Sequence, residues 1–99
     1  MAPQKPLTII ARVQAKPGQG ETLLAHQKEL VAAVVKEPGC LLYQPHVSNQ
    51  HPGLVIFVES WESYELWQVH MNAPALKAFK AKADHLVESV VIDEMTPVF

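Results

Sequence analysis

The sequence predicts a single ferredoxin-like domain, in which helices cover one face of a four-stranded antiparallel sheet. The first observation is the spacing of its apolar residues, which along the chain is typical of a strand, a helix, two strands, helices and a final strand. The second is that Pro-Gly pairs stand at residues 17–18, 38–39 and 52–53, between the predicted elements. The third is length, because 99 residues are enough for one domain spanning 1–99 and not for two.

The first two elements are a strand and an amphipathic helix. From Leu7 to Ala15 the side chains alternate, with Ile9 on one face and Arg12 on the other, and the Lys16-Pro17-Gly18 turn ends the strand. Between residues 19 and 36 leucines and valines recur at helical spacing, and Gln27 is expected toward the polar side. Pro38 ends this helix because it lacks a backbone donor and restricts the residue before it.

Two further strands are predicted at Cys40–Val47 and Leu54–Trp61, joined by a polar loop at residues 48–53. Pro45 cannot donate a hydrogen bond within a sheet, so the first of these strands should lie at an edge or carry a bulge. The second has large apolar residues pointing both ways, which is typical of a central strand covered on both faces.

Two helices and a strand complete the chain. Ser63 is the predicted N-cap of a short helix from Tyr64 to Met71, and Pro74 suits the first position of the next helix. The inward stripe of that second helix is expected to comprise Leu76, Phe79, Ala83, Leu86 and Val87. Residues 89–95 form the predicted last strand.

Composition excludes several classes of protein. The net charge is −2, and the eight basic residues are scattered, so there is no electrostatic footprint for nucleic acid or an anionic membrane. The longest purely apolar run, Leu54 to Val58, is too short for a membrane span, and the N-terminal segment Met1–Pro6 lacks an apolar signal core. A single cysteine, Cys40, cannot form an internal disulfide. We therefore expect a cytoplasmic protein.

A homodimer is expected from the distribution of apolar residues. Helices on one face of the sheet would leave Ile10 and part of the third strand on the other face. Such a patch would exceed the apolar area that monomers usually expose. Two copies packed sheet to sheet would cover it.

Several segments, in order and spacing, resemble the antibiotic biosynthesis monooxygenase family, in particular its quinol monooxygenase-like members. They are the run Glu37 to Tyr43, the strand end Phe57 to Trp61, His70, and the run Ala73 to Phe79. The resemblance implies a ferredoxin-like fold and a dimeric α/β barrel-like assembly. Such domains include cofactor-free quinol oxygenases, haem-degrading enzymes and an isomerase. The haem-degrading branch matches poorly, because its characteristic residues correspond here to Ala11, His70 and Lys80.

Three residues are candidates for catalysis. His70 stands nine residues after Trp61, where many family members place a histidine, and imidazole can act as a base near neutral pH. The alternative is a helix histidine bonded to a backbone carbonyl. Glu59 either pairs with Arg12 or orients His70. Tyr43 resembles the family tyrosine after the Pro-Gly turn and either offers its hydroxyl to a substrate oxygen or bonds a backbone group.

The remaining candidates would bind substrate. An aromatic wall is predicted from Phe57, Trp61, Tyr64 and Trp67, although aromatic residues at such spacing more often build core. Arg12 is included as the lone arginine of the neighbouring strand, and His46 as a histidine beside Pro45 that could face a pocket.

No metal or cofactor is predicted, because the chain has no phosphate-binding glycine loop and no convincing spacing of metal ligands. The resulting hypothesis is a cofactor-independent monooxygenase that oxidises a small electron-rich aromatic, such as a quinol or polycyclic phenol, with O2. One alternative is an isomerase that moves a proton on a small carbonyl compound. Another is a dimer that binds a small hydrophobic molecule without catalysis.

Overall fold

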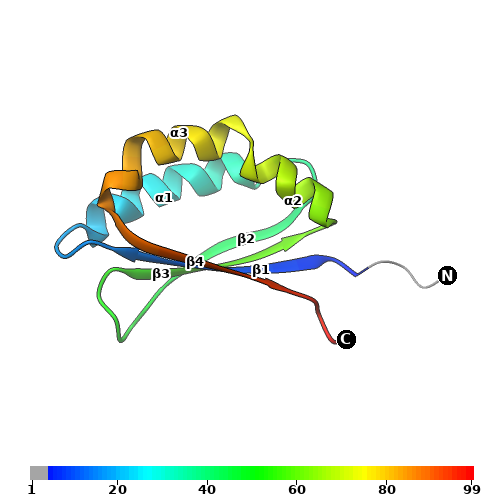
Figure 1. The fold of residues 1–99 in the computed structure, drawn as a ribbon, viewed down its shortest axis with the longest axis horizontal. Helices are drawn as coiled ribbons and strands as arrows, with labels where there is room; N and C mark the ends of the chain where they lie inside the picture. The colour runs from blue at the N-terminus through cyan, green and yellow to red at the C-terminus, as the bar shows by residue number, and fades with distance from the viewer. Residues whose placement is uncertain (1–4) are drawn as a thin grey trace.

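The computed structural model describes residues 5–99 and has two layers, with the helices on one side of a sheet (Figure 1). The N-terminal segment judged to lack a signal core therefore lies partly outside the described residues. The elements in chain order are β1 (Leu7–Ala15), α1 (Gly20–Val34), β2 (Cys40–Val47), β3 (Leu54–Trp61), α2 (Tyr64–Met71), α3 (Pro74–Ala83), the 3-10 helix η1 (Asp84–Leu86) and β4 (Val87–Met95).

The sheet has the order β2-β3-β1-β4, and every neighbouring pair is antiparallel. This is the ferredoxin-like arrangement, so the predicted fold class is confirmed. Pro45 lies on an edge strand as expected, and β2 also carries a register shift between Cys40 and Leu42. The prediction of a central third strand is likewise confirmed, because β3 lies between β2 and β1.

Three predicted boundaries were wrong. α1 ends at Val34 instead of residue 36. After Val34 the backbone forms turns that lead to Pro38. Leu86 and Val87 do not extend the stripe of α3, which ends at Ala83. The Lys16 amide donates to the Leu86 carbonyl (2.9 Å), and this bond draws the chain into the sheet. β4 consequently begins at Val87, two residues before the predicted start.

Ser63 sets the start of α2, and Gly39 allows the chain before β2 to pass close to this helix. The Ser63 hydroxyl accepts a hydrogen bond from the Leu66 amide (3.2 Å), as expected of an N-cap. Gly39 has φ +80°, and a Cβ at this position would lie 2.5 Å from the Leu66 side chain. A glycine is therefore required where the start of β2 passes beneath α2.

The core lies between the helices and one face of the sheet. It includes Ile9, Leu30, Phe57 and Trp61, all nearly inaccessible to solvent. On the opposite face Ile10, Ile56 and Val58 are only partly buried, so the helices of the chain cover one face of β3 and not both. None of the helices in residues 5–99 is long and apolar enough to cross a membrane.

Candidate active site

A cavity of about 250 Å³ lies between the sheet and the helices. Its wall is mostly apolar, with Phe57 from β3, Leu30 from α1 and Leu76 from α3 among the contributing residues. Six polar or ionisable side chains also line it: Gln27, Tyr43, Glu59, His70, Lys80 and Asp84. An apolar cavity with a few polar groups is the usual form of a small-molecule site.

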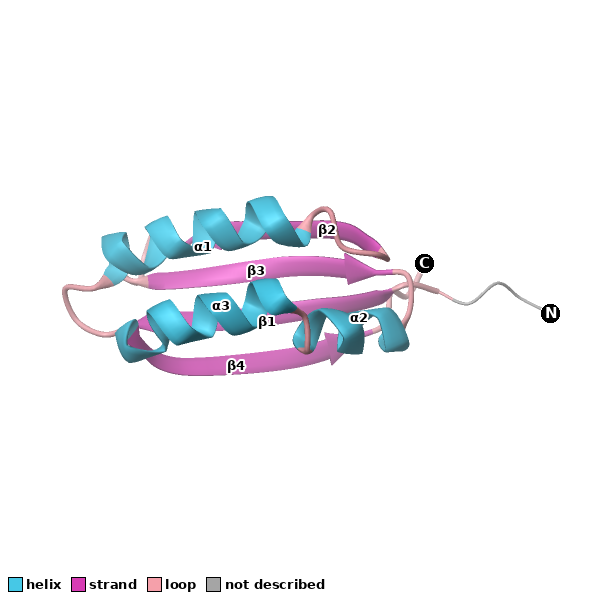
Figure 2. Ribbon diagram, turned by 90° about the horizontal axis from the view of Figure 1, so that it is seen from above, coloured by secondary structure: helices cyan, strands magenta, loops and turns pink. Residues whose placement is uncertain are grey.

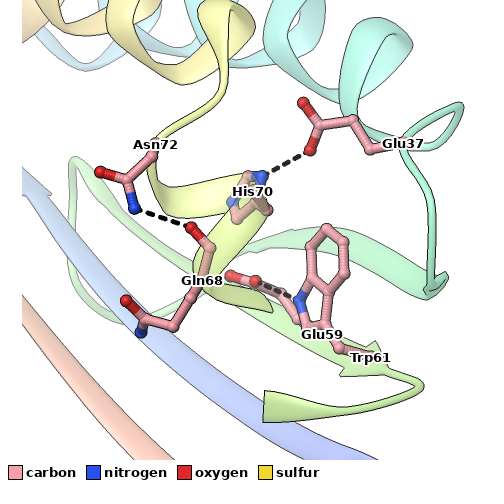
Figure 3. A network of polar contacts seen from close by, with 6 residues as sticks. All are labelled: Glu37, Glu59, Trp61, Gln68, His70 and Asn72. Carbon is pink, nitrogen blue, oxygen red and sulfur yellow. Dashed lines mark hydrogen bonds and ion pairs between the residues drawn. The ribbon is translucent and has the colours of Figure 1, made fainter. Parts of the chain in front are cut away.

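The shortest side-chain hydrogen bond at this cavity joins His70 to Glu37. The Nδ1 atom of His70, near the end of α2, lies 2.7 Å from Oε1 of Glu37, in the turn after α1 (Figure 3). His70 is only 2 % exposed, and its ring stacks on the Trp61 indole with 4.7 Å between ring centres. The imidazole is therefore held by a carboxylate at one edge and by an aromatic face.

This contact determines which ring nitrogen can act as a base. Burial lowers the pKa of His70, and the hydrogen bond to Glu37 opposes that change. In the neutral ring the Glu37 carboxylate requires the proton on Nδ1, which leaves the lone pair on Nε2. Within residues 5–99 no hydrogen bond to Nε2 is present, so this nitrogen is free to accept a proton from a ligand.

Glu59 is the second ionisable group of the cavity. It is 4 % exposed, and its Oε1 atom accepts a hydrogen bond from the Trp61 indole (3.0 Å; Figure 3). Burial raises the pKa of this carboxyl to about 7, and the bond from Trp61 opposes the rise. Glu59 can therefore exchange a proton near neutral pH.

The predicted partners of Glu59 were wrong. β1 pairs Ile9 with Glu59, whereas Arg12 lies opposite Ile56 and points to the face without helices. An ion pair between Glu59 and Arg12 is therefore not formed. The carboxylate that bonds His70 is Glu37 and not Glu59.

Tyr43 lines the cavity between these groups. Its ring centre lies 5.2 Å from that of Phe57 and 5.4 Å from that of His70. Burial, followed by the charges of Glu59 and Glu37, raises the pKa of this phenol far above its ordinary value, so it stays protonated. In the described chain its hydroxyl forms no hydrogen bond with another residue, which leaves it able to donate to a ligand.

Five other candidate residues do not line the cavity. Tyr64 is half exposed and packs on Trp67, which belongs to the core. Arg12 and His46 are exposed on the other face of the sheet, where His46 bonds the Gln44 carbonyl (3.2 Å). Trp61 is also absent from the wall, because it lies fully buried behind His70.

Sequence reasoning missed four polar residues of the site, namely Glu37, Gln27, Lys80 and Asp84. Glu37 was treated only as part of the Pro-Gly turn, although it bonds His70. Gln27 was expected on the polar side of its helix, yet it is 1 % exposed. The spacing of Leu23, Gln27, Leu30 and Val34 could have revealed this, because these positions form one stripe of a helix.

The chain is similar to known proteins of one family. The model of the antibiotic biosynthesis monooxygenase family matches residues 6–82. The chain belongs to this family. An Escherichia coli relative named "Probable quinol monooxygenase YgiN" is 31 % identical over 83 residues, which cover 74 % of this chain and 80 % of the relative.

Solved structures share the fold of this chain. The crystal structure of PA3566 from Pseudomonas aeruginosa is 29 % identical, with a TM-score of 0.92 over the whole of both chains. SO0527 from Shewanella oneidensis is 27 % identical, with a TM-score of 0.87 over 95 % of this chain and 92 % of that one. The family and the E. coli relative support a monooxygenase.

Proposed function

We propose that the protein oxidises a small electron-rich aromatic, such as a quinol or polycyclic phenol, with O2. The observation that carries this proposal is the His70–Glu37 pair at the wall of an apolar cavity, with Nε2 free to take a proton. Family membership and the name of the E. coli relative support the choice of substrate class.

The chemistry begins when His70 Nε2 removes a proton from the substrate hydroxyl or from an acidic ring carbon. The resulting anion is electron-rich and supplies the electrons that reduce O2. One oxygen atom enters the substrate, and the other leaves as water. Glu37 stabilises the imidazolium that forms, as a carboxylate does beside a catalytic histidine.

Tyr43 and Glu59 would act on the substrate oxygen. The Tyr43 phenol stays protonated and is suited to donate a hydrogen bond to the developing oxyanion. Glu59 in its protonated form can do the same, or can return a proton to the reduced oxygen. The apolar wall limits access of water to the reactive anion.

A second candidate function is isomerisation of a small carbonyl compound. It is favoured by the presence of two groups, His70 and Glu59, that can exchange protons in one cavity. Such an enzyme would exchange a substrate proton with solvent without consuming O2.

A homodimer is part of the proposal. Ile10, Ile56 and Val58 on the open face of the sheet are partly buried, and Leu42, Val91 and Met95 beside them are exposed. A second copy packed against this face would remove these side chains from water.

The test is O2 uptake with a panel of quinols and anthrone-like phenols, using protein treated with a chelator. We expect His70→Ala to lower the rate by roughly 10²–10⁴-fold, the usual contribution of a positioned base. Because His70 is buried, circular dichroism and the less disruptive His70→Gln must accompany it. His85→Ala, at an exposed position outside the cavity, is the matched control.

Each result has a defined meaning. Unchanged turnover in both His70 variants would eliminate this base. Loss of all turnover on chelation would show that the reaction needs a metal. Proton exchange without O2 uptake would favour the isomerase, and binding without either reaction would favour a non-catalytic protein.

A further inference from the structure

Gln27 occupies a position where its side chain lacks a partner within the protein. It lies in the apolar stripe of α1 and is 1 % exposed. Both amide atoms, Nε2 and Oε1, are buried, and neither forms a hydrogen bond with any residue from 5 to 99. Burial of an amide without hydrogen bonds is unfavourable, so an unpaired one in a native core calls for an explanation.

The cavity provides that explanation, because Gln27 is one of its lining residues. An amide carries both donors and an acceptor, so it can bond either a hydroxyl or a carbonyl oxygen. A ligand that brings such an oxygen into the cavity would satisfy the group that the protein leaves unpaired.

Gln27 lies toward the opposite end of the cavity from the His70–Glu37 pair. α1 rises about 1.5 Å per residue, so Gln27 is roughly 10 Å along the helix from Val34, after which the chain turns to Glu37. Leu23, one turn before Gln27, packs with Ala15 and Leu86 in a separate apolar cluster at the far end of the sheet. Gln27 thus lies between this cluster and the one that contains Trp61.

The side of the cavity formed by the sheet is about as long as the stretch of α1 from Gln27 to Val34. Glu59 is opposite Ile9 on β1, whereas Val13, which also lines the cavity, lies four residues along the same strand. Four residues of a strand span about 13 Å. The space between is lined by apolar side chains such as Ala11 and Phe57.

We propose that Gln27 binds a second oxygen of the substrate, at the end remote from the one that His70 deprotonates. The ligand class is then a flat apolar ring system with a hydroxyl or carbonyl at both ends. This inference deepens the proposed function and relies on the same cavity being the substrate site, but it concerns binding and not reaction with O2.

The test compares two ligand series by calorimetry under anaerobic conditions. One series contains naphthols with a single hydroxyl, and the other contains naphthalenediols with hydroxyls on opposite ends of the ring system. We expect the wild-type protein to bind the best diol more tightly than the naphthols. In Gln27→Leu the diol should lose about 10-fold or more in affinity, whereas naphthol binding should change little.

A second readout separates recognition from a structural role. Leucine suits an apolar stripe, so Gln27→Leu should leave the denaturation midpoint unchanged or raise it. Gln68→Leu, at a partly buried position of α2 outside the cavity, is the control and should not change diol binding.

Three results would overturn the inference. They are equal losses of affinity for both series in Gln27→Leu, a clear fall in its denaturation midpoint, or a wild-type protein that shows no preference for diols. Failure of the oxygenase proposal would look different, because diol binding would depend on Gln27 while O2 uptake stayed at the uncatalysed rate.

Discussion

Glu59 should make the folded protein less stable as the pH rises. Its pKa is raised from 4.5 to about 7 by burial, so between these values the native state holds a proton that the unfolded chain has released. Stability therefore falls with increasing pH across this window and levels off above about pH 7. The full difference corresponds to roughly 3 kcal/mol, of which about 2–3 kcal/mol should be lost between pH 5 and pH 8.

Glu59→Gln should remove this dependence. Glutamine keeps an oxygen that can accept the hydrogen bond from Trp61, but it has no charge to bury. The measurement is the unfolding free energy from urea titrations at several pH values for both proteins. As the pH increases, the unfolding free energy of the variant should rise relative to that of the wild type. The expected difference is a large fraction of the stability of an ordinary domain.

The unfolding free energies of the variant and the wild type must be compared at each pH, because the pH dependence of one protein alone contains contributions from other groups. Burial lowers the pKa of His70, which acts in the opposite direction, since that contribution to stability grows as the pH rises toward the value of an unfolded histidine. Glu62→Gln, at an exposed position just after the same strand, is the control and should follow the wild type. Parallel curves for Glu59→Gln and the wild type would refute the assignment of a buried, readily protonated carboxyl.

Two further predictions concern catalysis and assembly. Glu37→Gln should lower turnover by roughly 10- to 100-fold, which is less than the loss expected for His70 variants. The base remains, but it loses the charge that orients it and stabilises its protonated form. Steady-state O2 uptake would check this, and equal rates for the variant and the wild type would contradict it. Ile56→Glu should convert a dimer into monomers or aggregates, because it places a charge on the open face of the sheet. Light scattering at micromolar concentration tests this prediction, and a wild-type monomer would disprove the dimer itself.

The strands could be predicted well because their signals are local. Alternation and the Pro-Gly turns defined β1, β2 and β3 to the residue, and alternation also placed Phe57, Glu59 and Trp61 on one face. The start of α2 at Tyr64 was also predicted, from Ser63 as its N-cap.

The contacts of the site were harder to predict because they are made by tertiary packing. Glu37 and His70 are 33 residues apart and meet only when α2 packs beside the turn after α1. Strand register, which the sequence did not reveal, separates Arg12 from Glu59. Gln27 was predicted on the polar side of α1 because the buried stripe was identified by its apolar residues, and a polar residue within it does not fit that pattern.

The edge position of β4 has a consequence for how the substrate range of this protein can evolve. Val90 and Ile92 line the cavity, yet they are 53 % and 41 % exposed, and Figure 2 shows β4 along the margin of the sheet beyond α3. A substitution at these positions alters the shape of the site without opening a void in the core, so its effect on folding should be small. The opposite wall, which contains Phe57, belongs to the core and lacks this freedom. New substrates should therefore be gained first through changes in β4, while the residues around His70 stay the same.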